Sequence, residues 1–347
     1  MIILRMPAPS MQMSSVPAIS VVLPCWNAAG TLARAIESIR RQTFEDWEMV
    51  VVDDGSTDQS REVARAAAKQ DGRIRLLELP HRGIVQALRA GCEAARGQVI
   101  ARMDADDISE PRQFAMQVEL LESDSRIGLV GTQVWEMGSC GAELGRRDYL
   151  EWLNSLSTHD EITRNIFIEC PIAHPTFVMR KEALEDVGGY QDNGWAEDYD
   201  LIHRLNLAGY RFGNVPEMLL GWSEAPGRLS RTDPRYSRAS FRACKRHYLR
   251  AGLLDGGRRF VQWGAGAAGK EWLREWGEHQ PEAVIDINPR KIGEVIHGVR
   301  VIAPDDLPPR GEAVIVVTVP IAEARAEIRA WLNARSYVEL RDYVLAL

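Results

Sequence analysis

Residues 99–107 read Val-Ile-Ala-Arg-Met-Asp-Ala-Asp-Asp, an apolar run that ends in three carboxylates. Residues 49–58 repeat this arrangement as Met-Val-Val-Val-Asp-Asp-Gly-Ser-Thr-Asp, and a further acidic pair, Glu197 and Asp198, lies in a polar, aromatic segment. Two of the three clusters follow strand-like runs, so we expect them to meet at the carboxyl ends of parallel strands. Carboxylates gathered there suit a divalent cation that carries a phosphorylated ligand, with one carboxylate left to act as a base.

Strand-like and helix-like segments alternate on either side of these clusters. Short β-branched or apolar runs predict strands at residues 18–23, 49–52, 74–79 and 99–103. Helical patterns lie between them, at residues 32–39, 58–69 and 84–95. This alternation predicts an α/β fold built on a doubly wound parallel sheet.

Beyond Gly128 the alternation becomes irregular. Residues 174–179 predict another strand, and residues 184–190 read as the end of a helix with a glycine cap. Residues 199–208 predict a helix that is closed by Gly209. The sequence therefore predicts elements in this part of the chain but no regular topology.

The composition narrows the class of protein. A chain of 347 residues is comfortable for two domains, and 45% hydrophobic with 26% charged residues is typical of a soluble globular protein. A formal charge of -7 argues against a general nucleic-acid binder. The five cysteines are scattered and form no C-x-x-C pair, which indicates a reducing compartment and gives no zinc signature.

Nothing in the sequence predicts a membrane span or a signal peptide. No run approaches the roughly 18 apolar residues that cross a bilayer, and the first seven residues are too short and are broken by arginine and proline. Residues 1–17 are expected to be a disordered leader, and the protein is expected to be cytoplasmic. The basic stretch 228–259 is either a solvated helix and linker or a surface at the inner membrane face that attracts anionic lipid headgroups or a lipid-diphosphate acceptor.

A second α/β rhythm begins after the turn Asp255-Gly256-Gly257. We therefore expect one domain over residues 18–255, including the basic segment, and a smaller Rossmann-like domain over residues 256–347. A strand at 260–263 leads into a G-x-G-x-x-G pattern, then a helix from Lys270 and a strand at 283–285. These glycines either bind a ligand or serve only helix–sheet packing, and the candidate ligand site consists of Gly264, Gly266, Gly269 and Asp286.

Taken together, the motifs of the first domain resemble an inverting family 2 glycosyltransferase with a GT-A fold, over about residues 18–235. A lone D-x-D is common on any surface, but five elements in the family's order are specific. They are Val21–Asn27, Asp53–Asp58, Arg82-Gly83, Asp104–Asp106 and Glu197-Asp198.

The resemblance implies that a sugar is transferred from a UDP-sugar donor to a saccharide or lipid-linked acceptor, in cell-surface polysaccharide synthesis. It implies that either Asp53 or Asp54 accepts a hydrogen bond from the uracil ring, and the sequence leaves open which of them does. The residues that it assigns to the nucleotide-sugar are Pro24, Asn27, Asp53, Asp54, Arg82, Asp104, Glu197 and Arg228.

The resemblance also assigns the metal ligands and the general base. Asp104 and Asp106 are implied to hold Mn²⁺ or Mg²⁺, with Asp107 as a helper or as a helix N-cap. The ion would neutralise charge on the leaving diphosphate. Asp198 is the implied general base, and we expect its neighbour Glu197 to raise its pKa by like-charge repulsion.

One position departs from the family pattern. Ser223-Glu224-Ala225 stands where related sequences often carry Arg-Glu-His, and an alanine side chain can neither coordinate nor hydrogen-bond. Either Arg228 or a nearby residue takes over this role, or diphosphate binding is weakened. The alternative function is therefore a catalytically weakened nucleotide-sugar-binding or assembly protein. The residues select no donor sugar, acceptor, linkage or oligomeric state.

Overall fold

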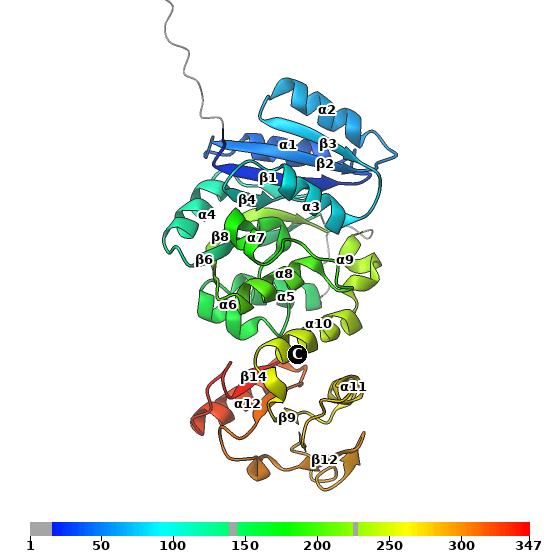
Figure 1. Ribbon diagram of the computed structural model, residues 1–347, viewed down its shortest axis with the longest axis vertical. Coiled ribbons are helices and arrows are strands. Elements are labelled where there is room, and N and C mark those ends of the chain that lie inside the picture. The colour runs from blue at the N-terminus through cyan, green and yellow to red at the C-terminus, as the bar shows by residue number, and fades with distance from the viewer. Residues whose placement is uncertain (1–15, 139–143, 225–227) are drawn as a thin grey trace, which may run out of the picture.

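The computed structural model describes residues 16–138, 144–224 and 228–347 (Figure 1). Nearly all of the expected leader, and Ala225, lie outside these ranges. Within them, no helix combines the length and the apolar character needed to cross a bilayer. Two sheets form, one in the first two thirds of the chain and a second in the C-terminal part, and the second sheet forms a further domain.

The first sheet begins as predicted. Its strands run in the order β3-β2-β1-β4-β7-β6-β8-β5, and the first four are mutually parallel. These four are β1 (Ile19–Cys25), β2 (Trp47–Asp54), β3 (Ile74–Leu79) and β4 (Val99–Arg102). The helices between them are α1 (Leu32–Arg40), α2 (Ser60–Gln70) and α3 (Ile84–Ala94). The α/β prediction is confirmed, and the strand ends bring the acidic clusters to one edge.

The other half of this sheet is mixed, and it is built from the part of the chain for which the sequence predicts no regular topology. Two antiparallel strands, β7 (Val178–Arg180) and β5 (Ile108–Ser109), accompany the long parallel pair β6 (Ile127–Met137) and β8 (Arg211–Ser223). The strand expected at 174–179 forms only in its second half. His174–Thr176 is a 3-10 turn, because Pro175 has a fixed φ and no N–H for a strand ladder.

Helices cover the mixed half. They are α4 (Gln113–Glu122), α5 (Leu144–Asn154), α6 (His159–Asn165), α7 (Lys181–Asp186), α8 (Glu197–Leu207), α9 (Leu229–Thr232) and α10 (Arg238–Ala251).

The glycine cap predicted at the end of α7 is confirmed. Gly188 and Gly189 have φ of 78° and 68°, and the N–H of Gly189 donates to the carbonyl of Leu184.

The second sheet has the order β11-β12-β10-β9-β13-β14, and all but β11 are parallel. Its strands are β9 (Phe260–Trp263), β10 (Val284–Ile285), β11 (Val295–Ile296), β12 (Val299–Ile302), β13 (Val314–Val317) and β14 (Tyr343–Leu345). Its helices are α11 (Ala267–Glu275) and α12 (Ala322–Ala334). The chain enters this sheet through a turn at Asp255–Gly257, where Gly256 and Gly257 have positive φ.

Helix α10 holds the two sheets together (Figure 1). Arg242 and Arg246 both bind Glu275 of α11, and the Arg250 guanidinium donates to the Trp276 carbonyl. Lys245 is buried, and its ammonium donates to the carbonyls of Ile168 (2.7 Å) and Ala346 (3.4 Å). These four cations of the basic stretch therefore have partners within the protein, and three of them are largely withdrawn from solvent, whereas Arg250 stays exposed.

The close packing of α3 on β1 and β2 supports one prediction. A Cβ on Gly91 would overlap the Cγ1 of Val22 and lie 3.0 Å from the Cγ2 of Val52. Although alanine usually favours a helix, Gly91→Ala should destabilise the fold by about 1–3 kcal/mol because the strand side chains cannot retreat. Gly145→Ala in α5 is the control, since open space surrounds its Cβ position. Urea unfolding measures both, and equal stabilities would contradict the packing argument.

Candidate active site

Two cavities meet at the carboxyl ends of the first sheet. The β2 cavity, of about 580 Å³, lies between the ends of β1 and β2 and includes Pro24 and Asn27 in its lining. The α8 cavity, of about 500 Å³, lies against the start of α8. Asp104, Asp106 and Arg228 line both, so the acidic cluster after β4 lies at their junction.

The acidic cluster has the donor set of a cation site. One oxygen each from Asp104, Asp106 and Asp107 lies within 4.8 Å of the others. Asp107 accepts from the Ser223 N–H at 2.7 Å, while its other oxygen is buried with no partner among the described residues. Asp107 is not a helix N-cap, because β5 follows it. Burial, and then the charge of Asp104, raise the pKa of both Asp106 and Asp107.

Of the two acids that end β2, Asp54 lines the β2 cavity, whereas Asp53 is not part of the lining of either cavity. Asp53 is fully buried, paired with Arg61 at 2.7 Å, and accepts from the Ser56 N–H. Asp54 accepts from the backbone N–H groups of Arg82 (2.8 Å) and Gly83 (2.9 Å). The structure thus separates the two acids, which the sequence left as equivalent candidates. Arg82 contacts Asp54 through its backbone N–H, and its side chain is not part of the lining of either cavity.

An aromatic pair at the mouth of the β2 cavity was not predicted from the sequence. The rings of Trp26 and His81 stack with centroids 4.5 Å apart and an interplanar angle of 15°. Trp26 is 53% exposed, and the His81 Nδ1 lies 2.8 Å from an oxygen of Asp54. Asn27 joins the two loops beside them, since its side-chain oxygen accepts from the Thr57 N–H at 2.8 Å. The signal for this pair was an aromatic residue directly after a strand end.

The other acidic pair occupies the first turn of α8. Glu197 is 1% exposed and accepts from the Tyr236 hydroxyl through both oxygens, at 2.9 and 2.7 Å. Asp198 lines the α8 cavity beside Cys170, whose Sγ lies 3.9 Å from its Oδ2. Tyr236 lies 39 residues further along the chain, and its contact with Glu197 was not predicted from the sequence.

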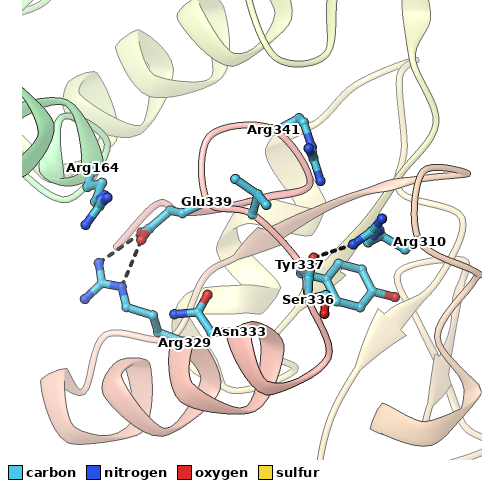
Figure 2. A pocket seen from close by; sticks show the side chains of 9 residues that line it. Arg164, Arg310, Arg329, Asn333, Ser336, Tyr337, Glu339 and Arg341 are labelled. Carbon is cyan, nitrogen blue, oxygen red and sulfur yellow. Dashed lines mark hydrogen bonds and ion pairs between the residues drawn. The ribbon is translucent and has the colours of Figure 1, made fainter.

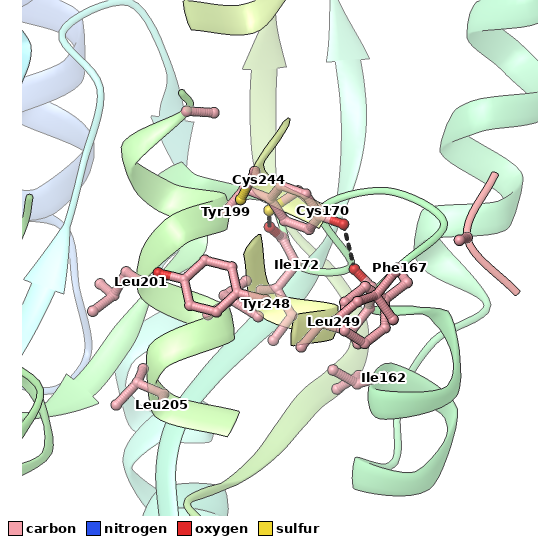
Figure 3. Packing of buried hydrophobic residues seen from close by; sticks show 14 of the residues in the cluster. Ile162, Phe167, Cys170, Ile172, Tyr199, Leu201, Leu205, Cys244, Tyr248 and Leu249 are labelled. Carbon is pink, nitrogen blue, oxygen red and sulfur yellow. Dashed lines mark hydrogen bonds between the residues drawn. The ribbon is translucent and has the colours of Figure 1, made fainter. Parts of the chain in front are cut away.

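The packing behind α8 fixes this turn (Figure 3). Tyr199 and Leu205 belong to the same buried cluster as Tyr248 and Leu249 of α10. The Tyr199 hydroxyl also donates to the Ile166 carbonyl at 2.5 Å. With one face of α8 held in the core, the side chain of Asp198 is left on the cavity side.

Burial is the main influence on the pKa of the two acids. Burial raises the pKa of Asp198 to about 6, and Glu169 adds to this effect. Burial and then the charge of Asp198 raise the pKa of Glu197 to about 7. The repulsion between the two carboxylates is mutual, and burial is the largest cause of the raised pKa of each.

Two arginines stack on a tryptophan ring at the junction of the two cavities. The guanidinium carbons of Arg146 and Arg228 lie 4.6 and 4.7 Å from the ring centroid of Trp222. Both guanidinium groups also pair with Glu224, at 3.5 and 3.2 Å. Arg228, a predicted site residue, lines both cavities, whereas Arg146, from α5, was not predicted. Ala225 is outside the described residues, so only its neighbour Glu224 is located.

The glycine turn of the C-terminal domain forms after β9, with Gly264 at φ 123°. Asp286 accepts from the Ala265 N–H at 3.1 Å and pairs with Lys291 at 2.8 Å. A Cβ on Gly269 would collide with the Gly264 carbonyl oxygen. These contacts use Asp286 within the protein and favour the packing role of the glycines.

Comparison with known proteins identifies the family. Residues 20–188 match the family described as Glycosyl transferase family 2. The putative glycosyltransferase EpsE of Bacillus subtilis is 31% identical over 246 residues, which are 67% of this chain and 84% of the relative. The amylovoran biosynthesis glycosyltransferase AmsE of Erwinia amylovora is 31% identical over 192 residues, 54% of this chain and 69% of the relative.

The solved structures support the fold. TarS of S. aureus, residues 1–349 in complex with UDP-GlcNAc, matches with a TM-score of 0.56 at 17% identity, over 75% of this chain and 72% of TarS. Its UDP complex matches with a TM-score of 0.52 at 16% identity, over 74% and 70%. Given the EpsE match over most of both chains, this chain belongs to glycosyltransferase family 2 and is a glycosyltransferase of the GT-A fold.

Proposed function

We propose that this glycosyltransferase is metal-dependent and inverting, and that it moves a sugar from a UDP-sugar to a saccharide or lipid-linked acceptor in polysaccharide synthesis. The observation that carries the proposal is the meeting of two cavities at Asp104 and Asp106, with Asp198 facing the second one. This arrangement suits a nucleotide on one side of the acidic cluster and an acceptor on the other. The UDP-GlcNAc bound in TarS supports the class of donor.

The β2 cavity suits the nucleotide. The stacked rings of Trp26 and His81 offer a flat face for a base, and Asp54 lies beside them as a hydrogen-bond acceptor. Asp54 is therefore the acid we propose for the uracil ring. Asp53 instead holds the loop through Arg61 and Ser56. Arg228, at the junction, is positioned to face the diphosphate.

The acidic cluster fits a divalent ion. Asp104 and Asp106 would hold Mn²⁺ or Mg²⁺, and the unpartnered buried oxygen of Asp107 gives them a third donor. When bound, the ion would neutralise charge on the leaving diphosphate. The raised pKa of Asp106 and Asp107 agrees with this use, since crowded carboxylates are stabilised by a cation between them.

The α8 cavity suits the acceptor, since Tyr149, Trp222 and Phe241 line it with aromatic rings. Asp198 would take the proton of an acceptor hydroxyl as its oxygen attacks the anomeric carbon. The new carbon–oxygen bond forms opposite the departing nucleoside diphosphate, which leaves with the electrons of the old bond, so the configuration inverts. Glu197, held by Tyr236, keeps the first turn of α8 in place.

The test is release of nucleoside diphosphate from a panel of UDP-, GDP- and dTDP-sugars, with Mn²⁺ and with Mg²⁺. Turnover of at least one UDP-sugar supports the proposal, and turnover restricted to another nucleotide refutes the UDP assignment. Tight UDP binding by calorimetry without any turnover would favour the alternative, a catalytically weakened nucleotide-sugar-binding protein. Activity gained on Ala225→His would support that alternative further.

The stacking assignment makes a separate prediction. Trp26→Ala should weaken UDP binding about three- to tenfold, because an aromatic stack is worth about 0.5–1.5 kcal/mol. Arg82→Ala is the matched comparison and should leave UDP affinity nearly unchanged, since only the backbone of Arg82 reaches Asp54. Calorimetric titration with UDP measures both. A larger loss in Arg82→Ala than in Trp26→Ala would restore the role that the sequence assigned to Arg82.

A further inference from the structure

A third cavity, of about 620 Å³, lies where α6 of the first domain faces α12 and the loop before β14 (Figure 2). We call it the junction cavity. It shares no lining residue with the β2 and α8 cavities. Four arginines from separate parts of the chain line it, Arg164, Arg310, Arg329 and Arg341.

The positive charge of this lining is only partly compensated. Arg329 binds Glu339, the one acidic residue of the lining, through two hydrogen bonds of 3.0 and 2.9 Å. Arg341 pairs with Asp342 at 2.8 Å. Across the described ranges, neither Arg164 nor Arg310 has a carboxylate within ion-pair distance, and both are exposed. Two arginines without a carboxylate partner among the described residues therefore line one cavity, in a chain whose formal charge is -7.

The hydrogen-bonding groups of the lining are mainly donors. A guanidinium group donates only. Asn333 uses its carbonyl oxygen to accept from the Tyr343 hydroxyl at 2.8 Å, which leaves its amide N–H groups. Arg310 donates one guanidinium N–H to the Ser336 carbonyl at 2.6 Å, which leaves its other N–H groups for a ligand. A ligand that complements such a lining must be an anion rich in acceptor oxygens.

The loop that carries these groups is held in place without a ligand. Ser336 and Leu340 both have φ of 63°, a left-handed conformation that side chains other than glycine rarely adopt. The Arg310 contact to Ser336, the Arg329–Glu339 pair and a bond from the Val338 N–H to Asp342 (2.9 Å) hold this conformation. A site whose groups are already positioned loses less conformational freedom when a ligand binds.

We propose that the junction cavity binds a phosphate-bearing ligand through Arg164 and Arg310. Phosphate oxygens match the paired donors of guanidinium groups and need no metal in a cavity that is already cationic. The site is separate from the donor site, and because its arginines come from both domains, its ligand would bridge them. The proposal does not depend on the function proposed above.

The test is calorimetric titration of the full chain with inorganic pyrophosphate in EDTA at low ionic strength, which removes metal-dependent binding at Asp104 and Asp106. The double variant Arg164→Gln/Arg310→Gln should lose at least about tenfold in affinity. The double variant Arg258→Gln/Arg300→Gln removes the same charge from two exposed arginines outside the lining, and should bind like wild type. Thermal unfolding checks that both variants fold, and each single variant should show a partial loss.

A second arm distinguishes the source of the phosphate. Cosedimentation with phosphatidylcholine vesicles, with and without phosphatidylglycerol, shows whether Arg164 and Arg310 take a lipid headgroup. Binding of pyrophosphate alone would assign a soluble phosphorylated ligand, and both results support the site. The proposal is overturned if wild type binds neither probe, or if the Arg164/Arg310 variant and the Arg258/Arg300 control bind equally well.

Discussion

Asp198→Asn should lower the turnover of the UDP-sugar by at least about a hundredfold, the usual contribution of a general base. The amide keeps the shape of the side chain but cannot take the acceptor proton, so UDP affinity should be nearly unchanged. Steady-state transfer assays and calorimetry measure the two quantities. Asp192→Asn is the matched control, because Asp192 is exposed on the loop just before α8.

The pH dependence of the wild type gives an independent readout of the same base. Asp198 acts only when ionised, and burial raises its pKa to about 6. Activity should therefore be low at pH 5 and rise through the range from about 6 to 7 where Asp198 and Glu197 lose their protons. A rise centred near pH 4, or full turnover in Asp198→Asn, would show that this carboxylate does not act as the base.

Asp106→Ala, or removal of divalent ions with EDTA, should lower transfer by at least about a hundredfold. A metal-held diphosphate is stabilised by several kcal/mol as it leaves, and each 1.36 kcal/mol is worth about a factor of ten in rate. Excess Mn²⁺ or Mg²⁺ should restore wild type after EDTA but not Asp106→Ala. Transfer rates across a metal titration measure both effects.

Asp46→Ala serves as the control for this second experiment, since Asp46 is an exposed acid before β2 and away from the cluster. Thermal unfolding of Asp106→Ala separates loss of the site from loss of the fold. Unchanged activity in EDTA, with Asp106→Ala as active as Asp46→Ala, would leave the cluster without a metal role.

Much of the site could be predicted from local sequence. Acidic residues directly after buried runs, as in Asp54 and Asp104, must lie at the carboxyl edge of a parallel sheet, because strand direction fixes where each run ends. The gathering of these clusters around one pair of cavities is confirmed. The α8 start was predicted two residues late, which left Glu197 and Asp198 outside the helix whose first turn they form.

The residues that the sequence did not identify are those positioned by long-range contacts. Tyr236 reaches Glu197 across 39 residues, and Arg146 joins the predicted Arg228 through the ring of Trp222 and the carboxylate of Glu224. His81 follows β3 and stacks on Trp26, which follows β1, once both strands are paired with β2. None of these residues carries a local pattern, since a polar or aromatic side chain in a loop looks the same whether it is solvated or bound.

The basic stretch 228–259 shows the same limit of local reasoning. Its composition left a solvated helix and a lipid-binding surface as alternatives, yet Arg242, Lys245, Arg246 and Arg250 bind partners in the other sheet or at its junction. Charge is visible in a sequence, whereas the acceptor that neutralises it is brought by the packing of another element.

The sequence by itself determined the α/β class, the parallel direction of the first strands and the gathering of the acidic clusters. These features follow from hydrophobic periodicity and strand direction, which are local properties. Only the tertiary structure decided that Asp54, and not Asp53, faces a cavity, and that Arg164 and Arg310 share one. It also decided that burial raises the pKa of both Glu197 and Asp198. The physical reason is that burial and the approach of distant side chains depend on how whole elements pack, and no spacing along the chain encodes that directly.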